Sequence, residues 1–183
     1  FREGKYNLLL HSTRDYVFGK SSAWFPNCYD DTLIYPLNAP LKNHFIGFCG
    51  NYVNRRQILQ VLEDKYGLKK DIFVIGDDMV KAINSYKIHF NRNILNDINY
   101  RSFETIGCGT MLVTNANYQY DLLGFKDFEN CVLYSNNDEL LEKLDYCLEN
   151  QEKVEEITRK GLELAKKHTY HARIQRLLNF LKE

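Results

Sequence analysis

Short continuous runs of apolar residues alternate along the chain with segments in which apolar residues recur at helical spacing. The continuous runs predict buried strands, and they are YNLLL (6–10), HFIGFCG (44–50), DIFVIG (71–76), KIHFN (87–91), MLVTN (111–115) and NCVLYS (130–135). The helical segments are RRQILQVLEDKYG (55–67), DMVKAINSY (78–86), YRSFETIGCG (100–109) and NNDELLEKLDYCLEN (136–150), and two more helical patterns continue to Leu181. Apolar strands that alternate with helices predict a parallel sheet covered on both faces. The expected fold class is α/β, a Rossmann-like parallel sheet flanked by helices, with further helices at the C-terminus.

Two helix ends carry sequence signals of their own. Gly67 follows the first helical segment at a position that favours a left-handed C-terminal cap. Asn136 precedes the fourth segment and is a good N-cap residue, and that segment places Leu140, Leu141, Leu144 and Leu148 on one face. Residues 14–44 show no such pattern and hold all three prolines and the single tryptophan. We expect them to form an irregular connecting segment laid over the surface.

The composition narrows the function classes. Lys+Arg and Asp+Glu both number 24, so the formal net charge is zero, which argues against a dedicated nucleic-acid partner. No apolar run approaches the roughly 20 residues that span a bilayer, so no transmembrane segment is predicted. The five cysteines are scattered without metal-ligand spacing, which favours reduced, packed thiols, a cytoplasmic protein and no bound metal. Because the chain begins at Phe1, we expect it to be part of a longer protein.

The carboxyl ends of parallel strands meet at one edge of a sheet, where ligands of open α/β folds bind. The predicted strand ends carry Gly50-Asn51, Gly76-Asp77, Asn91-Arg92 and Thr114-Asn115. In GNYVNRR (50–56), a glycine ends a strand and allows close backbone approach, and the start of the helix that follows carries Arg55 and Arg56, which suits a phosphate. The segment has neither the GxGxxG nor the Walker pattern, and a solvated helix start with two surface arginines is the alternative.

The segment YRSFETIG (100–107) places Arg101 and Glu104 one helical turn apart. Arg101 lies in the first turn, where the helix dipole disfavours a cation unless an anion is near. A carboxylate accepts two hydrogen bonds side by side, which matches the vicinal hydroxyls of a ribose. The pair is therefore interpreted either as ligands of a nucleotide or as an i,i+3 surface ion pair that contributes little to stability.

Several stretches, taken in order, resemble the C-terminal domain of glycosyltransferases with two facing Rossmann-like domains, the GT-B fold. They are KIHFNRN, INYRSFETIGCGTMLVTN, VLYSNNDELLEKLDYCLEN and KKHTYHAR, and the likeness is to the "glycosyl transferases group 1" branch that includes CgeB-like proteins. The resemblance covers about residues 45–180, and WFPNCYDD resembles the segment that links the two domains. It implies that residues 1–44 are the end of an N-terminal domain and the interdomain linker, and that 45–183 is the nucleotide-sugar-binding domain.

The resemblance also implies a function, namely donor binding for transfer of a hexosyl group to an unknown acceptor, which could be a glycan, a protein or a small molecule. The donor is expected to be a UDP- or GDP-sugar, used without a metal or other cofactor. The expected nucleotide-sugar-binding residues are Gly50, Asn51, Arg55, Arg56, Gly76, Asn91, Tyr100, Arg101 and Glu104. Glu104 matches the ribose-binding glutamate, and Asn96 stands where retaining relatives often place another glutamate. Any catalytic base is expected in the missing N-terminal domain, so the isolated chain should bind donor with little or no transfer.

Two other function classes remain open at this point. The first is a Rossmann-like module that no longer catalyses and serves as an interaction or scaffolding domain. The second is a flavodoxin-like signalling receiver, for which Asp77 and Asp78 are the only acidic candidates at a strand end.

Overall fold

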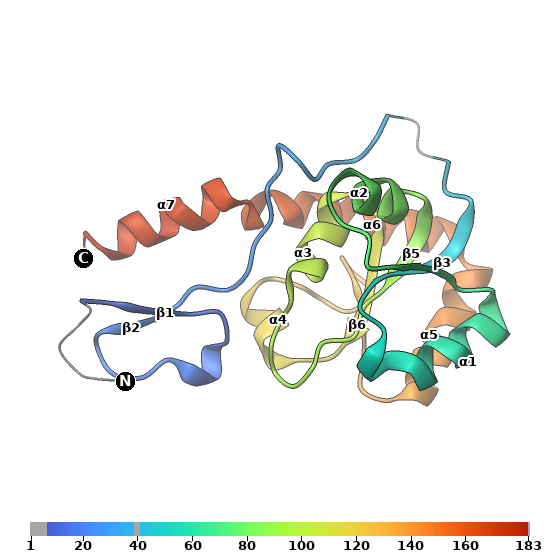
Figure 1. Cartoon of the computed structure of the whole chain (residues 1–183), viewed down its shortest axis with the longest axis horizontal. Helices are drawn as coiled ribbons and strands as arrows, with labels where there is room; N and C mark the ends of the chain where they lie inside the picture. Colours follow the sequence, from blue (N-terminus) through green and yellow to red (C-terminus); the bar gives the residue numbers. More distant parts are fainter. Residues whose placement is uncertain (1–6, 39–40, 183) are drawn as a thin grey trace.

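A five-stranded, fully parallel sheet forms the centre of the protein, in the order β4-β3-β5-β6-β7. A computed structural model describes residues 7–38 and 41–182 (Figure 1). The strands of this sheet are β3 (His44–Gly50), β4 (Lys69–Ile72), β5 (Tyr86–Phe90), β6 (Met111–Asn115) and β7 (Val132–Tyr134). The predicted α/β class is confirmed.

Helices follow the strands, and most of them pack against the sheet. They are α1 (Arg56–Tyr66), α2 (Gly76–Asn84), α3 (Tyr100–Gly107), α4 (Tyr118–Leu122), α5 (Asn137–Glu149), α6 (Gln151–Ala165) and α7 (Tyr170–Phe180). Single 3-10 turns occur at Arg14–Tyr16, Val53–Arg55 and Lys166–His168. The expected caps are present, since Gly67 has φ 66° after α1 and the Asn136 side chain accepts a hydrogen bond from the Glu139 N–H.

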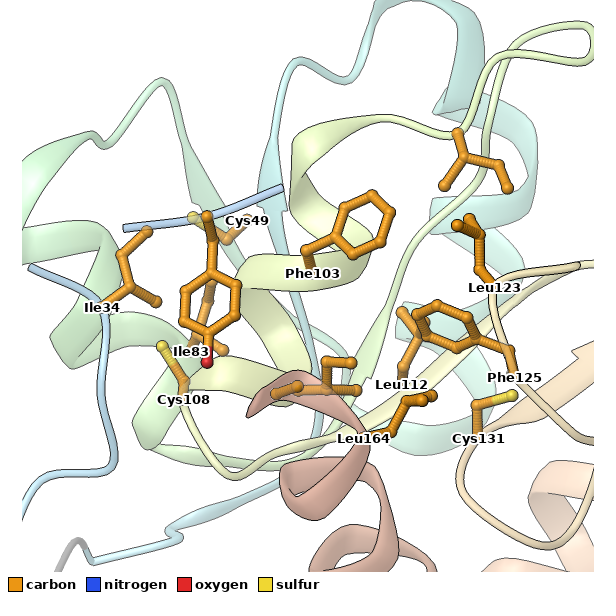
Figure 2. Packing of buried hydrophobic residues seen from close by; sticks show 14 of the residues in the cluster. Ile34, Cys49, Ile83, Phe103, Cys108, Leu112, Leu123, Phe125, Cys131 and Leu164 are labelled. Atoms are coloured by element: carbon orange, nitrogen blue, oxygen red, sulfur yellow. The ribbon is translucent and has the colours of Figure 1, made fainter. Parts of the chain in front are cut away.

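Two clusters of buried apolar side chains, one on each face of the sheet, form the core. On one face α1 and α5 pack against Ile46 and Phe48 of β3. On the other, α2 and α3 pack against Cys49 and Leu112, as Figure 2 shows around Phe103. Helix α6 contributes to both clusters. A central parallel strand covered on both faces needs apolar residues at every position, which explains the uninterrupted run in β3.

The order of the strands reverses beside β3. The chain passes from β3 outward to the edge strand β4, returns to the other side of β3 to form β5, and then continues to β6 and β7. A crevice therefore opens beyond the carboxyl ends of β3 and β5, at the topological switch point.

The N-terminal part adds a small two-stranded parallel sheet, β1 (Leu9–His11) and β2 (Ser22–Trp24). The strand expected over 6–10 thus lies later, and its first residue falls outside the described residues. Residues 14–44 are more than a surface connection, because Tyr29 and Ile34 belong to the core. The Tyr29 ring packs over Gly107, where an added Cβ would lie 2.6 Å from it.

Three expectations of the sequence are corrected by the structure. The strand over 71–76 is instead β4, because Phe73 has φ 59° and ends the extended backbone. Phe73 and Ile75 are exposed, because they lie after the end of β4, in the loop that leads to α2. Leu148 is exposed on α5, where Cys147 is buried in its place, and the apolar residues of α7 are also largely exposed.

In the part of the chain that the structure describes, no helix combines the length and the apolar character needed to cross a membrane. The five cysteines are buried and free, as the sequence predicted.

Candidate nucleotide site at the switch-point crevice

The crevice at the switch point holds a cavity of about 600 Å³. One wall is residues 53–58, which follow β3 and begin α1, and the other is residues 92–95, which follow β5. This volume lies within the range of small-ligand sites, about 300–1,000 Å³. The cavity therefore lies where the topology of the sheet places a ligand site.

Arg55 joins the two walls of this cavity. Its Nε and Nη2 donate to the carbonyl oxygen of Arg92 at 2.9 and 2.5 Å, and its Nη1 donates to that of Asn51 at 2.9 Å. Burial and, more weakly, the charge of Arg92 lower the pKa of Arg55, whereas Tyr134 opposes the shift. Arg55 thus fixes the spacing of the walls and keeps further N–H donors on its two terminal nitrogens.

Arg56 and Arg92 complete a group of three guanidinium groups around the cavity. Arg56 is exposed and stacks over the Tyr52 ring, with its Cζ 4.9 Å from the ring centroid. Among residues 7–38 and 41–182, Arg101 is the only arginine that forms an ion pair with a carboxylate. Guanidinium groups without carboxylate partners favour an anion at this place.

A buried network of amide and hydroxyl groups supports the β5 side of the crevice. The Asn93 Nδ2 donates to the Tyr120 hydroxyl at 2.7 Å, and that hydroxyl lies 2.8 Å from the Ser102 Oγ. The Asn91 Nδ2 donates to the same Ser102 Oγ at 3.1 Å, and Asn91 exchanges hydrogen bonds with the side chain of Asn99 at 3.2 Å in both directions. The network holds the start of α3 against the end of β5.

The side chains of Arg101 and Glu104 form an ion pair on α3, with Nη1 2.7 Å from Oε2. The pair is largely buried, with 19% and 16% of the two side chains exposed, so it is not a solvated surface pair. Arg101 also contacts the Met79 Sδ of α2. Burial raises the pKa of Glu104, and the charge of Arg101 opposes the rise.

The structure separates the predicted site residues into groups. Arg55 and Arg56 line the cavity, whereas Arg101 and Glu104 form their ion pair between α2 and α3, outside its lining. The other predicted residues stand at element ends around the same edge of the sheet, namely Gly50 and Asn51 after β3, Gly76 at the start of α2, Asn91 after β5 and half-exposed Tyr100 at the start of α3. The side chain of Asn91 is buried and engaged in the network, so its role is to support the edge.

Arg92 and Asn93 line the cavity on its β5 side but were not among the predicted binding residues. Their signal was the alternation Asn-Arg-Asn directly after a buried strand, of which only the first asparagine was selected. Asn96 is exposed, and its side chain donates to Asp15 at 2.8 Å. His89 is fully buried and accepts a hydrogen bond from the Cys49 N–H, so it is a core histidine.

No group of three or more histidine, cysteine, aspartate or glutamate side chains in the described part of the chain is arranged to hold a metal ion.

Known proteins identify both the fold and the family of this chain. The fold is that of the C-terminal half of a GT-B glycosyltransferase. The sequence model of the family described as "Glycosyl transferase-like" matches residues 47–179, and the chain belongs to that family. A sequence search of the curated proteins finds no match.

Solved structures show the same fold at low sequence identity. Anabaena HepE in complex with UDP and glucose is similar with a TM-score of 0.76 and 13% identity, over 97% of this chain and 63% of HepE. Sucrose-phosphate synthase from Thermosynechococcus elongatus gives 0.69 and 12%, over 90% of this chain and 53% of the synthase. The C-terminal domain of LpcC, a group 1 family glycosyl transferase from Francisella tularensis, gives 0.59 and 12%, over 77% of this chain and 98% of that domain. The chain thus spans roughly half to two thirds of the longer proteins and nearly all of the isolated C-terminal domain.

Proposed function

We propose that this domain binds the sugar-nucleotide donor of a glycosyltransferase, with the diphosphate held in the crevice between β3 and β5. The observation that carries the proposal is the cavity of about 600 Å³ at the switch point, lined by Arg55, Arg56 and Arg92. None of the three has a carboxylate partner within ion-pair distance among the described residues.

The charge pattern supports a diphosphate as the anion. Arg55 precedes α1 and Arg56 begins it, a place where the helix dipole disfavours cations unless an anion balances them. Guanidinium groups can each bind two phosphate oxygens, and together they can stabilise the charge that develops on a leaving nucleotide. Transfer without a metal ion is therefore part of the proposal.

Glu104 is assigned to the ribose hydroxyls. Glu104 lies one turn into α3, a helix that begins at the same edge of the sheet as the crevice, and the burial of its side chain strengthens hydrogen bonds to a ligand. Arg101 faces Glu104 and α2, so we assign it a positioning role, in which it holds Glu104 in place and keeps it ionised, in preference to the phosphate contact that the sequence suggested.

The nucleobase is assigned to the loop between β4 and α2. Phe73 is 65% exposed and Ile75 is 80% exposed, although both are large and apolar. The Tyr52 ring lies 6.2 Å from that of Phe73 in an edge-to-face arrangement. An apolar loop beside a cationic crevice suits a base joined to a diphosphate.

Calorimetric titration of the chain with UDP, GDP and uridine tests the proposal. HepE, which shares this fold, is described in complex with UDP and with UDP-glucose, which makes UDP the first nucleotide to test. We expect UDP or GDP to bind more tightly than uridine. We expect Arg56→Gln to lower the affinity for the nucleoside diphosphate about tenfold, which is the effect of losing a hydrogen bond to a charged group. The matched control is Arg159→Gln, an exposed arginine of α6 outside the crevice.

Equal binding of uridine and UDP, or equal effects of Arg56→Gln and Arg159→Gln, would exclude a diphosphate in the crevice. A nucleotide at about 100 times its dissociation constant should add roughly 2.7 kcal/mol to the free energy of unfolding. If neither UDP, GDP nor their sugars raise the melting temperature, the alternative of a non-catalytic interaction domain is favoured. Transfer of a hexosyl group requires acceptor-binding residues that we place outside this chain.

A further inference from the structure

A second cationic cavity lies away from the crevice, where the N-terminal sheet approaches α7. Figure 1 shows β1 and β2 at the same end of the molecule as α7. The cavity between them has a volume of about 310 Å³, which is the size of a small-ligand site. It is lined by apolar residues from β2, α4 and α7, including Trp24, Leu122 and Leu177, and by three arginines, Arg14, Arg173 and Arg176.

The arginines of this cavity lack anionic partners. No aspartate or glutamate lines the cavity. In addition, no carboxylate of residues 7–38 or 41–182 lies within ion-pair distance of Arg14, Arg173 or Arg176. Three like charges around one small volume repel one another unless an anion lies between them.

Arg173 is the unusual member of the three, because only 2% of it is exposed. Its Nη2 donates to the carbonyl oxygen of Asn27 and to the Nδ1 of His168, both at 3.1 Å and both uncharged acceptors. Its Nε is buried and has no hydrogen-bond partner among the described residues. Burial lowers the pKa of Arg173, and Arg176 lowers it further, while Cys28 opposes both. A buried guanidinium without a counter-ion is unfavourable.

The walls show what kind of anion would suit. A small inorganic anion would satisfy the arginines and leave the apolar walls in water. An anion with an apolar body satisfies both, because its tail covers the side chains of β2, α4 and α7 while guanidinium groups hold its head.

We propose that this cavity binds a small amphiphilic anion, a carboxylate or phosphate monoester with an apolar tail. The inference is independent of the proposed sugar-nucleotide site, since the two cavities share no lining residue. A phosphate and a carboxylate offer the same paired oxygens to an arginine, so both head groups are tested.

Trp24 provides a local signal for the experiment, because it lines the cavity and is the single tryptophan of the chain. The chain is titrated with octyl phosphate, octanoate, octanol and inorganic phosphate, and binding is followed by tryptophan fluorescence and by calorimetry. We expect the two octyl anions to bind and change the fluorescence, and octanol and inorganic phosphate to bind at least about tenfold more weakly. Within the alkyl phosphates from butyl to octyl, affinity should rise about two- to fourfold for each methylene that becomes buried.

Variants of the two exposed arginines test the head-group contact while leaving the buried Arg173 in place. Arg14→Gln and Arg176→Gln should each lower the affinity for octyl phosphate severalfold. Arg159 is exposed and lies outside the cavity, so Arg159→Gln should not change this affinity. The proposal is overturned if octanol binds as tightly as octyl phosphate, if both arginine variants keep the affinity of the unchanged chain, or if binding leaves the Trp24 fluorescence unaltered. Binding of UDP should not change that fluorescence, so failure of either site is recognised separately.

Discussion

Arg101 donates to Glu104 across one turn of α3, with 2.7 Å between Nη1 and Oε2. The burial of both side chains makes this pair more than a surface contact. The burial favours protonation of Glu104, and the adjacent cation opposes it. The protonation of Glu104 is thus controlled in part by a residue of its own helix.

We predict that Arg101→Gln destabilises the fold at pH 7 by about 1–3 kcal/mol, less than for a fully buried pair. Loss of the cation raises the pKa of Glu104 further above its ordinary value. A raised pKa in the folded state means that the contribution of Glu104 to stability is fully present below about 4.5 and is lost as pH rises through the folded-state pKa. Urea unfolding at several pH values should show the penalty of Arg101→Gln shrinking as pH falls from 7 toward 4.5.

The matched control for this prediction is the double variant Arg101→Gln/Glu104→Gln. It has no carboxylate to titrate at this place, so its difference from the unchanged chain should vary little with pH. A penalty of Arg101→Gln that stays constant between pH 7 and 5 would contradict the electrostatic account and indicate lost packing against Met79.

Two buried tyrosines differ in what their hydroxyl groups do. The Tyr120 hydroxyl is bonded to Asn93 and Ser102, whereas that of Tyr134 has no partner among the described residues. We predict that Tyr120→Phe lowers the free energy of unfolding by about 1–2 kcal/mol, because polar partners are left unsatisfied. Tyr134→Phe should be neutral or slightly stabilising, because it removes a buried hydroxyl that forms no bond.

The same pair of variants also probes the crevice. Because the Tyr120 network supports the loop that follows β5, Tyr120→Phe should lower the affinity for UDP severalfold. Tyr134→Phe should leave this affinity unchanged. Thermal melts and calorimetry on the two variants measure both effects. Equal effects of the two substitutions would show that the network does not position the site.

Features that depend on residues close together in the chain were predictable from the sequence, whereas features that depend on the arrangement of the strands were not. The helix that carries Arg101 and Glu104 was predictable because helical spacing and two glycines define it within ten residues. The network around Tyr120 was not, because it depends on which strands become neighbours. Phe73 shows the converse error, since an apolar run predicts a buried strand but does not show that the strand ends at Ile72 and that the apolar residues after it form an exposed loop.

Alanine substitutions at two glycines should destabilise the protein for different reasons, a steric clash at Gly47 and a strained backbone at Gly67. At Gly47 an added Cβ would lie 2.3 Å from the ring of Tyr86, which is fully buried. We predict that Gly47→Ala destabilises the protein by about 3 kcal/mol or more, at the upper end of what overpacking does. Gly67 has open space around it but a φ of 66°, so Gly67→Ala should lose only about 1–2 kcal/mol. Similar losses for both variants in urea unfolding would mean that Tyr86 can move aside.

Substitutions of the neighbouring Arg55 and Arg56 should differ in their effects on stability and on UDP binding. Arg55 makes three hydrogen bonds to carbonyl oxygens that join the two walls of the crevice. We predict that Arg55→Gln lowers the melting temperature by several degrees, because losing these hydrogen bonds lowers the free energy of unfolding by about 1–3 kcal/mol. The same substitution should also lower the affinity for UDP. Arg56→Gln should weaken UDP with little change in melting temperature, because the side chain is exposed. Unchanged stability of Arg55→Gln would contradict its structural role.

His168 gives a pH dependence of the opposite sign to that of Glu104. Arg173 can only donate, so the Nδ1 of His168 accepts its hydrogen bond and the Nε2 carries the proton that is donated to the Leu123 carbonyl at 2.9 Å. Burial, reinforced by the charge of Arg173, lowers the pKa of His168 to about 4. The neutral imidazole therefore stabilises the fold above the unfolded-state pKa of about 6.5, and this contribution is lost as pH falls toward 4.

We predict that the stability difference between the unchanged chain and His168→Gln narrows on acidification from pH 7 to 4.5, by up to about 1.4 kcal/mol per pH unit below pH 6.5. The glutamine side chain retains an N–H donor for Leu123 but does not titrate, so groups common to both proteins cancel in the difference. Parallel urea unfolding series on the two proteins provide the measurement. A constant difference across this range would mean that His168 keeps an ordinary pKa in the folded state and that Arg173 does not control its protonation.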